Sequence, residues 1–214
     1  MEILKLKNIT YQKDENLILD NLTFSVNKND FIMISGPSGS GKTTFLKLIG
    51  DLISPTEGNI YYKNQDINEF KPEKYREKIS YIFQTPHLFS DKVIDDLKFP
   101  FEIKEKKIEM DKVYKYLELF SLSTSILDKN PKNLSGGEKQ RIALIRTILT
   151  EPEVLLLDEI TASIDSENAL IIENTIKKLN SQGVTILWVS HSEEQKNLGN
   201  RKLIIDKGRI DVDG

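Results

Sequence analysis

A glycine-rich segment between two apolar runs constrains the fold of this chain more than any other feature. The segment Phe31–Gly50, FIMISGPSGSGKTTFLKLIG, fits the pattern G-x-x-x-x-G-K-[ST], with a strand-sized run before the glycines and a helix-compatible run after them. In that context backbone amides turn toward a phosphate group, and the helix N-terminus adds partial positive charge. A Gly/Ser turn can match the pattern by chance, but strand, loop and helix together favour a phosphate-binding loop.

The loop residues have distinct expected contacts with a nucleotide. We expect Lys42 to reach the β- and γ-phosphates and the Thr43 hydroxyl to ligate Mg²⁺. The backbone amides of the loop provide the remaining phosphate contacts. The candidates for phosphate binding are Gly36, Pro37, Ser38, Gly39, Ser40, Gly41, Lys42, Thr43 and Thr44.

Two adjacent carboxylates, Asp158 and Glu159, follow another apolar run, VLLL. A Mg·ATP site needs one carboxylate to hold the ion with its water shell and a second to orient the attacking water. We therefore assign Asp158 to the metal and Glu159 to the water. Taken alone, the pair is explained equally well as a solvated strand end, and only the upstream phosphate loop favours the catalytic interpretation.

The order of the predicted elements indicates an α/β fold. Residues 1–34 contain strand-like runs, and a helix over 43–49 and a strand over 79–84 come after the phosphate loop. The runs VLLLD and VTILWVS are typical of buried parallel strands, and KLIID predicts a last strand. The helix expected between VLLLD and VTILWVS ends before Gly183 and has one apolar face, formed by Ala169, Ile172, Ile176 and Leu179.

A helical segment interrupts this order. From about residue 85 to 140 the regular pattern is helical, with Met110, Val113, Leu117 and Phe120 at helical spacing. We predict one domain, in which residues 1–84 and 141–214 form a catalytic core with a β subdomain. Residues 85–140 form a helical insert.

The segment Asn27–Asp30, NKND, matches the guanine-reading pattern NKxD of GTPases. That motif belongs after the phosphate loop, whereas here it comes before the loop. A turn is the better interpretation, with Asn29 in the left-handed conformation that usually requires glycine.

Composition narrows the classes of partner. The 214 residues include 30 Lys and Arg against 33 Asp and Glu, so no broad basic field exists and no nucleic-acid partner is expected. The chain has no cysteine, which excludes disulfides and thiolate metal sites and fits a reducing compartment. Its densest apolar runs fall far below the ~20 residues of a membrane span, and its start lacks a signal-peptide core. We therefore expect a cytoplasmic chain.

A second glycine-rich helix entrance lies at Leu134–Arg146, LSGGEKQRIALIR. Ser135 is suited to cap the helix, and Glu138 three residues later completes a capping box. This local pattern does not explain Gly136 and Gly137, which leave backbone amides and the positive end of the helix open to an incoming phosphate.

Together these residues resemble the ATP-binding subunit of ABC transporters, and the resemblance covers essentially the whole chain. LSGGEKQ is similar to the signature loop, the most specific motif of that family. Other positions match in order: Tyr11 resembles the aromatic that stacks on adenine, Gln84 the Q-loop glutamine, Ser163–Asp165 the D-loop, and His191 the switch histidine. Each has a local alternative, as a strand aromatic, a strand end, a helix cap or a strand terminus. Their common order argues against independent accidents.

The resemblance implies a P-loop NTPase (RecA-like) core with an N-terminal antiparallel β subdomain and an inserted α-helical subdomain. It implies ATP and Mg²⁺, bound in a head-to-tail homodimer, with each ATP between the P-loop of one copy and the signature loop of the other. It also implies a location on the inner face of the cell membrane, beside an integral membrane permease contacted through about Gln84–Phe89. On this pattern the catalytic candidates are Glu159, His191 and Gln84, the metal candidates are Thr43, Gln84 and Asp158, and the ATP-binding candidates add Tyr11, Ser135, Gly136 and Gly137 to the phosphate loop.

A narrower resemblance concerns the transported substrate. The segment at 71–100, KPEKYREKISYIFQTPHLFSDKVIDDLKFP, together with LLDEITASID, is similar to a small subfamily of bacterial ATPases described as iron exporters. The wider family often has proline and then Thr-Ser-Ala-Leu-Asp after the catalytic glutamate. Here Ile160, which is typical of this subfamily, is followed by Thr-Ala-Ser-Ile-Asp at 161–165. Pro86 to Phe89 would face the permease, although a loop packed on the helical insert is an alternative. Within transporters, a lipoprotein- or peptide-exporter ATPase is the leading alternative.

Non-transport members of the same superfamily differ from this sequence in their organisation. A DNA-repair or chromosome ATPase would carry a very long coiled coil between the Gln84 and Ser135 segments, and no such pattern is present. A ribosome-associated ATPase would have two tandem cassettes, whereas this sequence has one. A nucleotide-binding regulator without turnover is disfavoured by Glu159 and His191.

Overall fold

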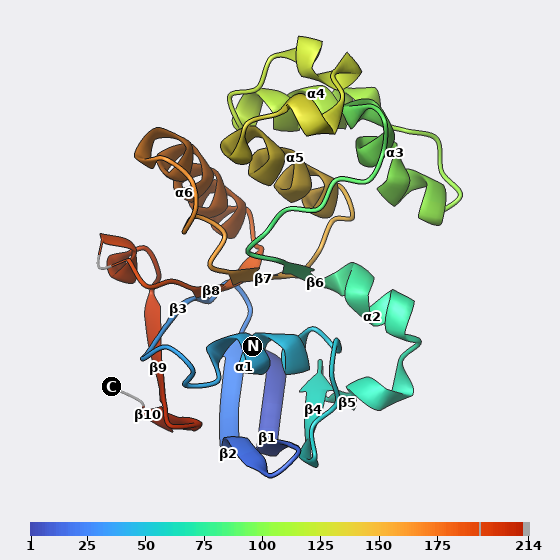
Figure 1. Cartoon of the computed structure of the whole chain (residues 1–214). Helices are drawn as coiled ribbons and strands as arrows, with labels where there is room; N and C mark the ends of the chain where they lie inside the picture. Colours follow the sequence, from blue (N-terminus) through green and yellow to red (C-terminus); the bar gives the residue numbers. More distant parts are fainter. Residues whose placement is uncertain (193, 212–214) are drawn as a thin grey trace.

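Two β-sheets of different type form the frame of the chain in its computed structural model, which describes residues 1–192 and 194–211 (Figure 1). Within this part, one sheet is antiparallel with strand order β2-β1-β4-β5, and the other is mostly parallel with order β10-β9-β3-β8-β7-β6. The strands are β1 (Glu2–Lys13), β2 (Asn16–Asn27), β3 (Phe31–Ser35), β4 (Glu57–Tyr62), β5 (Gln65–Asp66), β6 (Ile79–Ile82), β7 (Val154–Asp158), β8 (Thr185–Val189), β9 (Arg201–Asp206) and β10 (Arg209–Asp211).

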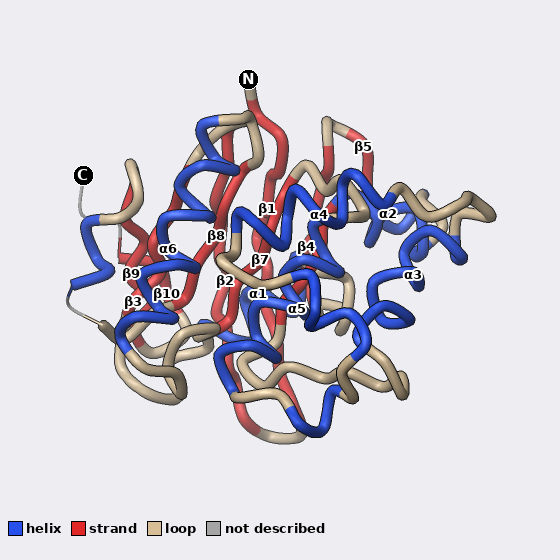
Figure 2. The backbone as a smooth tube through the Cα atoms, turned by 90° about the horizontal axis from the view of Figure 1, so that it is seen from above, coloured by secondary structure: helices blue, strands red, loops and turns tan. Residues whose placement is uncertain are grey.

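Helices occupy both faces of the mostly parallel sheet. Figure 1 shows α1 between the two sheets and α3 to α6 on the other side of β6, β7 and β8, and Figure 2 looks down on these helices as they cross the strands. Among the described residues, none of the helices is both long and apolar enough to span a bilayer. The helices are α1 (Lys42–Ile49), α2 (Pro72–Lys78), α3 (Val93–Ile103), α4 (Met110–Leu119), α5 (Gly136–Ile148) and α6 (Ser166–Ser181), with short 3₁₀ helices η1 (Ile67–Glu69), η2 (Thr124–Asp128), η3 (Pro131–Asn133) and η4 (Glu194–Asn197).

The apolar strands of the central sheet are buried on both faces, which explains their continuous hydrophobic runs. Strand β3 pairs with β8 and β9 in parallel, and β7 pairs with β8 and β6 in parallel. Because successive side chains point to opposite faces, each strand contributes to two cores. Phe31 and Met33 pack with the helices α3 to α6, whereas Ile32 and Ile34 pack with α1 and the antiparallel sheet.

Most predicted elements are confirmed, including the parallel pairing of VLLLD with VTILWVS. NKND is a turn: Asn29 has φ 64, and the Asp30 carboxylate accepts a hydrogen bond from the Asn27 amide at 2.8 Å. Arg201 of β9 also pairs with Asp30. The GTPase interpretation therefore has no structural basis, because these residues close the connection between β2 and β3.

The helical insert contains more order than its sequence pattern indicated. Helix α4 and the buried Val113, Leu117 and Phe120 agree with the predicted spacing. Helix α3 was not predicted, and neither was the shorter α2 before the insert. Helix α5 continues from Gly136 to Ile148, so it crosses the predicted boundary between residues 140 and 141 without a break. The division into core and insert stays a prediction.

A buried ion pair connects α3, α5 and the loop before α3. The Asp96 carboxylate is fully buried and accepts from Arg146 Nη1 at 2.8 Å and from the amides of Phe89 and Ser90 at 3.3 Å. Arg146 Nη2 donates to the His87 carbonyl at 2.8 Å, and its guanidinium lies 4.9 Å from the Phe89 ring centroid. Burial lowers the pKa of Arg146 and the charge of Asp96 opposes that shift. The pair therefore fixes the loop 87–90 against the end of α5.

Replacing Asp96 tests this connection. Asp96→Ala should lower the free energy of unfolding by about 3 kcal/mol, because it leaves the Arg146 charge buried without its partner. The matched control is Asp95→Ala, whose side chain is 47% exposed and pairs with Lys98 on the same helix. That variant should cost less than about 1 kcal/mol. Urea unfolding measures both, and equal losses would contradict the role given to Asp96.

Candidate nucleotide-binding and hydrolysis site

The phosphate loop runs from the end of β3 into α1, as its sequence predicts. Gly36 has φ 141, and a Cβ there would lie 2.0 Å from the Ile205 carbonyl oxygen. Gly41 has φ 103, and a Cβ there would lie 2.6 Å from Leu19 Cδ2. Both positions require glycine, because they combine the left-handed region of backbone conformation with close neighbours. The neighbouring elements β9 and β2 therefore set the shape of the loop.

The ammonium group of Lys42 is buried and bonded to the phosphate loop itself. Its ammonium donates to the Gly36 carbonyl at 2.9 Å and to the Pro37 carbonyl at 2.7 Å, and the residue is only 5% exposed. Burial lowers the pKa of Lys42, while the charges of Glu159 and Asp158 act in the opposite direction. Ser40 Oγ is buried without a hydrogen-bond partner among the described residues. A buried cation beside an unpaired hydroxyl and a helix N-terminus fits a phosphate group.

A hydroxyl and a carboxylate meet where the loop enters α1. Thr43 Oγ1 donates to Asp158 Oδ1 at 3.0 Å, so the two residues predicted to hold the metal are in direct contact. The second oxygen, Oδ2, accepts from the Tyr81 hydroxyl at 2.6 Å. Hydroxyl and carboxylate oxygens are the ligands that Mg²⁺ prefers, so this donor set fits that ion.

Tyr81 is a site residue that the sequence analysis missed. Burial raises the pKa of the Tyr81 hydroxyl, and its hydrogen bond to Asp158 and the charge of that residue raise it further, so it stays a donor. The contact between Tyr81 and Asp158 could have been found only from the register of strands β6 and β7. Tyr81 lies opposite Leu156 in the parallel pair β6–β7, and Asp158 lies two residues further on the same face of β7. Only the pairing of these two strands reveals the contact.

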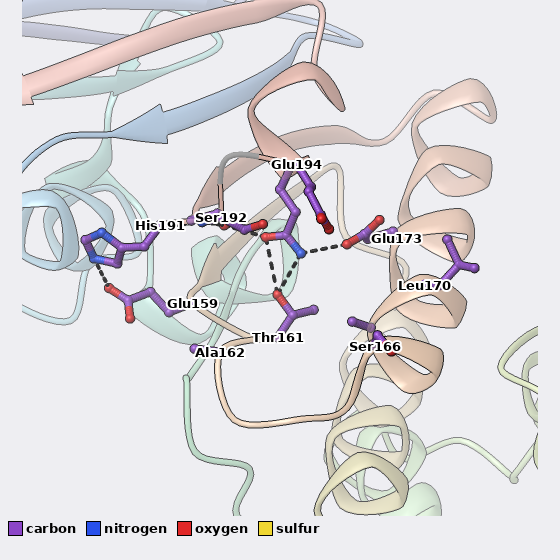
Figure 3. Close-up of a pocket in the computed structure, with 12 residues that line it drawn as sticks. Glu159, Thr161, Ala162, Ser166, Leu170, Glu173, His191, Ser192 and Glu194 are labelled. Carbon is purple, nitrogen blue, oxygen red and sulfur yellow. Dashed lines mark hydrogen bonds and ion pairs between the residues drawn. The ribbon is translucent and has the colours of Figure 1, made fainter.

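Glu159 brings the three catalytic candidates together. Its backbone has φ 50, in the left-handed region, while its amide donates to the Val189 carbonyl at 3.0 Å. Its Oε1 lies 2.9 Å from His191 Nε2, and its Oε2 accepts from Gln84 Nε2 at 3.4 Å. Figure 3 shows the contact between Glu159 and His191. Strained backbone of this kind is common at functional sites, where the surrounding structure holds it.

One cleft joins these groups to the phosphate loop. It has a volume of about 330 Å³ and is lined by the loop from Ser38 to Thr44, by Glu159 and His191, and by Ile18 of β2. Ile18 was not predicted, because only the packing of β2 over the loop places it there. Tyr11, on β1, is partly buried against the core beside β2 and is not among the residues that line this cleft in the described part of the chain.

The predicted capping box of LSGGEKQ is confirmed. The Glu138 amide donates to Ser135 Oγ at 3.1 Å, and the Ser135 amide donates to Glu138 Oε2 at 2.8 Å. The backbone hydrogen bond from Ser135 lowers the pKa of Glu138. No residue of Ser135–Gly137 lines the cleft of its own chain, as far as the structure describes it.

The two glycines of this loop have different surroundings. A Cβ on Gly136 would meet no atom within 4 Å, whereas one on Gly137 would lie 2.6 Å from Asn168 Cγ of α6. Asp165, the predicted N-cap of α6, holds Asn168 by accepting from its backbone amide at 2.9 Å and its Nδ2 at 2.6 Å. Gly137 is therefore a packing residue between α5 and α6, and Gly136 is the open position.

The site defines a P-loop nucleotide hydrolase, and comparisons with known proteins identify its family. A family model described as "ABC transporter" matches residues 19–162. The "Probable iron export ATP-binding protein FetA" of Escherichia coli (strain K12) is 42% identical over 204 residues, which cover 95% of this chain and 91% of that protein. The "Spermidine/putrescine import ATP-binding protein PotA" of Desulfitobacterium hafniense (strain Y51) is 35% identical, over 98% of this chain and 61% of that protein.

Solved structures agree. The dimeric post-hydrolysis state of an ATP-binding cassette bound to ADP and Pi has a TM-score of 0.86 at 30% identity, covering 98% of this chain and 97% of that chain. A bacterial Atm1-family ABC exporter with ATP bound has a TM-score of 0.87 at 25% identity, but this chain covers 38% of it. The chain belongs to the ABC transporter family. It is an ATP-binding subunit with the P-loop NTPase fold and is an ATPase.

The different surroundings of Gly136 and Gly137 make a matched test. Gly137→Ala should lower the free energy of unfolding by about 1 to 3 kcal/mol, because the added methyl group overlaps Asn168. Gly136→Ala should leave that free energy unchanged or raise it by up to about 1 kcal/mol, because alanine favours a helix and the position is open. Urea unfolding of both variants checks this, and similar losses would contradict the different packing assigned to the two glycines.

Proposed function

We propose that this chain is the motor subunit of an ABC transporter and hydrolyses Mg·ATP with Glu159 as the general base. The observation that carries the proposal is the position of the Glu159 carboxylate. It lies between Gln84 and His191 on the wall of the phosphate-loop cleft. A carboxylate held there by two neighbours can accept a proton from a water molecule that attacks the γ-phosphate.

The other residues hold the nucleotide in place. Lys42 and the loop amides bind the β- and γ-phosphates, and His191 holds the γ-phosphate and water in line. Thr43 and Asp158, with Gln84, would hold Mg²⁺, which would neutralise charge on the phosphate oxygens. Tyr81 fixes the orientation of Asp158 through its 2.6 Å hydrogen bond. Tyr11 is assigned to adenine stacking only by its resemblance to the family motif.

Two copies of the chain form the complete site. The Ser135–Gly137 loop lies outside the cleft of its own chain, yet Gly136 faces open space at the positive end of α5. We infer that this loop binds the ATP held by the other copy, in a head-to-tail homodimer. The dimeric cassette with ADP and Pi supports this arrangement. Dimer stability then depends on nucleotide concentration, because ATP belongs to the interface.

The base assignment predicts the behaviour of one variant. Glu159→Gln should reduce kcat at least about a hundredfold, because the amide cannot accept the proton of the attacking water. ATP binding should persist, and an ATP-bound dimer should accumulate in light-scattering measurements. Glu118→Gln, on the exposed face of α4, is the control and should hydrolyse ATP normally. Full turnover by Glu159→Gln would rule out the general base.

An apolar groove beside the site suits a membrane partner. It has a volume of about 260 Å³ and lies between the β6 end of the sheet and helices α3 and α5. Phe83, Phe99 and Ile103 line it with 50%, 40% and 58% exposure, and the exposed Phe89 ring contacts Phe99 with 5.0 Å between centroids. An exposed cluster of aromatic residues marks an interaction surface. We propose that a short apolar helix of the permease occupies it.

The connection between this groove and the nucleotide is short. Gln84, which contacts Glu159, directly follows Phe83 in the chain, and the loop 87–90 is fixed by Asp96 and Arg146. We infer that hydrolysis of the nucleotide beside Glu159 shifts Gln84, and with it Phe83 in the groove that the permease contacts. This short connection supports our proposal that the chain lies on the inner face of the cell membrane, beside the permease.

Iron is the proposed cargo, and export the proposed direction. The support is the relative that is 42% identical over 95% of this chain and named for iron export. Relatives named for spermidine/putrescine import are 35% identical or less. Because the motor does not contact the cargo, the iron assignment and the ATPase mechanism are tested separately.

Reconstitution tests the partner and the cargo. Vesicles that contain this chain and the membrane protein that co-purifies with it should move Fe²⁺ in an ATP-dependent manner. Phe99→Glu should abolish transport while the isolated chain keeps its basal ATPase activity, because a charge in the apolar groove blocks docking. Leu17→Glu, an exposed apolar residue on β2, is the matched control. A permease that couples to ATP but moves no iron would remove the iron assignment alone.

A further inference from the structure

A second cavity lies directly beside the hydrolysis site and contains contacts that the proposed chemistry does not use. Its volume is about 550 Å³, and it is bordered by the turn after Glu159, by the first turns of α6 and by the segment after His191 (Figure 3). Gln195, in η4, lies in its wall and is only 4% exposed. A buried amide with neighbours from three elements is a candidate positioning residue.

The Gln195 amide group is hydrogen-bonded to the turn that follows Glu159. Its Nε2 donates to Thr161 Oγ1 at 2.9 Å and to Glu173 Oε1 at 2.7 Å. Figure 3 marks the contacts that reach Thr161 and Glu173. Thr161 belongs to the turn closed by the Ala162 amide, which donates to the Glu159 carbonyl at 3.0 Å. Gln195 therefore anchors the backbone immediately after the proposed general base.

The carbonyl end of the same side chain is bonded to the segment that carries His191. Gln195 Oε1 accepts from the Ser190 hydroxyl, and Ser190 Oγ in turn accepts from the Ser192 amide at 3.1 Å. Ser190 is 7% exposed and directly precedes His191. These bonds close a tight loop around His191, so the histidine is held from both of its chain neighbours.

We propose that Gln195 is a positioning residue that holds the His191 loop and the turn after Glu159 as one unit. It is not among the described residues that line the phosphate-loop cleft, and it acts by keeping His191 Nε2 beside the Glu159 carboxylate. This role rests on the proposed function of those two residues in hydrolysis. Small displacements of such groups impair turnover without changing how tightly ATP is held, because the phosphate loop is not involved.

The contact between residues 195 and 173 needs an amide on at least one side, because two carboxylates cannot form a hydrogen bond with each other. In the unchanged protein Gln195 both donates and accepts, because Glu173 is an acceptor and Ser190 a donor. Gln195→Glu would set two carboxylates against each other in a buried place, and their repulsion would open the contact. Adding Glu173→Gln restores the missing donor from the opposite side. The double variant therefore exchanges the amide and the carboxylate, and the Thr161 hydroxyl then donates to residue 195 instead of accepting from it.

Steady-state hydrolysis of the full chain tests the proposal. Gln195→Glu should lower kcat about tenfold to a hundredfold, with KM for ATP within about twofold of the unchanged protein. Glu173→Gln alone should have nearly unchanged kcat, and the exchanged double variant should recover kcat to within about threefold of it. Unchanged kcat in Gln195→Glu, or no recovery in the double variant, would overturn the proposal.

Two further variants remove ambiguity. Thr161→Val deletes the contact to the turn without adding charge, and should lower kcat with KM unchanged; full turnover would count against the positioning role. It keeps the test valid if Gln195→Glu does not fold, which circular dichroism reports. Glu159→Gln is measured in parallel. If that variant hydrolyses ATP normally, the proposed base is wrong. The loss of kcat in Gln195→Glu and its recovery in the double variant test the positioning role of Gln195 separately.

Discussion

The parallel pairing of four neighbouring strands is the constraint on which the rest of the structure depends. Strands β3, β8, β7 and β6 end at one edge of the sheet, and each is followed there by a site residue or segment. The phosphate loop follows β3, His191 follows β8, Glu159 follows β7 and Gln84 follows β6. Because parallel strands share one direction, residues far apart in the chain meet within hydrogen-bonding distance. The burial of both sheet faces holds this edge in place.

The surroundings of Glu159 combine rigid support with exposed chemistry. Its amide is bonded to β8, its φ of 50 turns the side chain toward the cleft, and Ile160 after it is 2% exposed in the helical core. The burial of Ile160 in the helical core anchors the chain immediately after Glu159. Gln195 contacts the same turn through Thr161, and Asp158 is fixed from β6 by Tyr81. The proposed catalytic residues are thus held by residues from other elements that take no part in the chemical step.

Sequence patterns predicted the elements with strong local signals and missed those without them. The phosphate loop, the capping box at Ser135, the N-cap at Asp165 and the left-handed Asn29 follow from residue types within a few positions of one another. Helix α3 was not predicted because its apolar residues are mixed with Pro100 and acidic residues. Its buried Asp96 pairs with Arg146, which lies 50 residues away in the sequence. Three site residues were also missed because their roles come from strand register or from packing between distant segments: Tyr81, Ile18 and Gln195. Glu159 was assigned from the carboxylate pair after VLLL, whereas Gln84 and His191 were assigned from family motifs. The meeting of the three side chains is a property of the fold.

The sequence by itself determined which chemical groups the chain can bring to a nucleotide. A glycine-rich loop, paired carboxylates and a capped second loop are encoded locally, because backbone conformation and hydrogen bonding over a few residues suffice to specify them. The tertiary structure decided which of these groups meet. It joined Glu159 with Gln84 and His191, kept Ser135 to Gly137 out of the cleft of their own chain, and left an aromatic groove exposed beside Gln84. The physical reason is that strand pairing and core packing act between segments distant in sequence, so no local pattern records them.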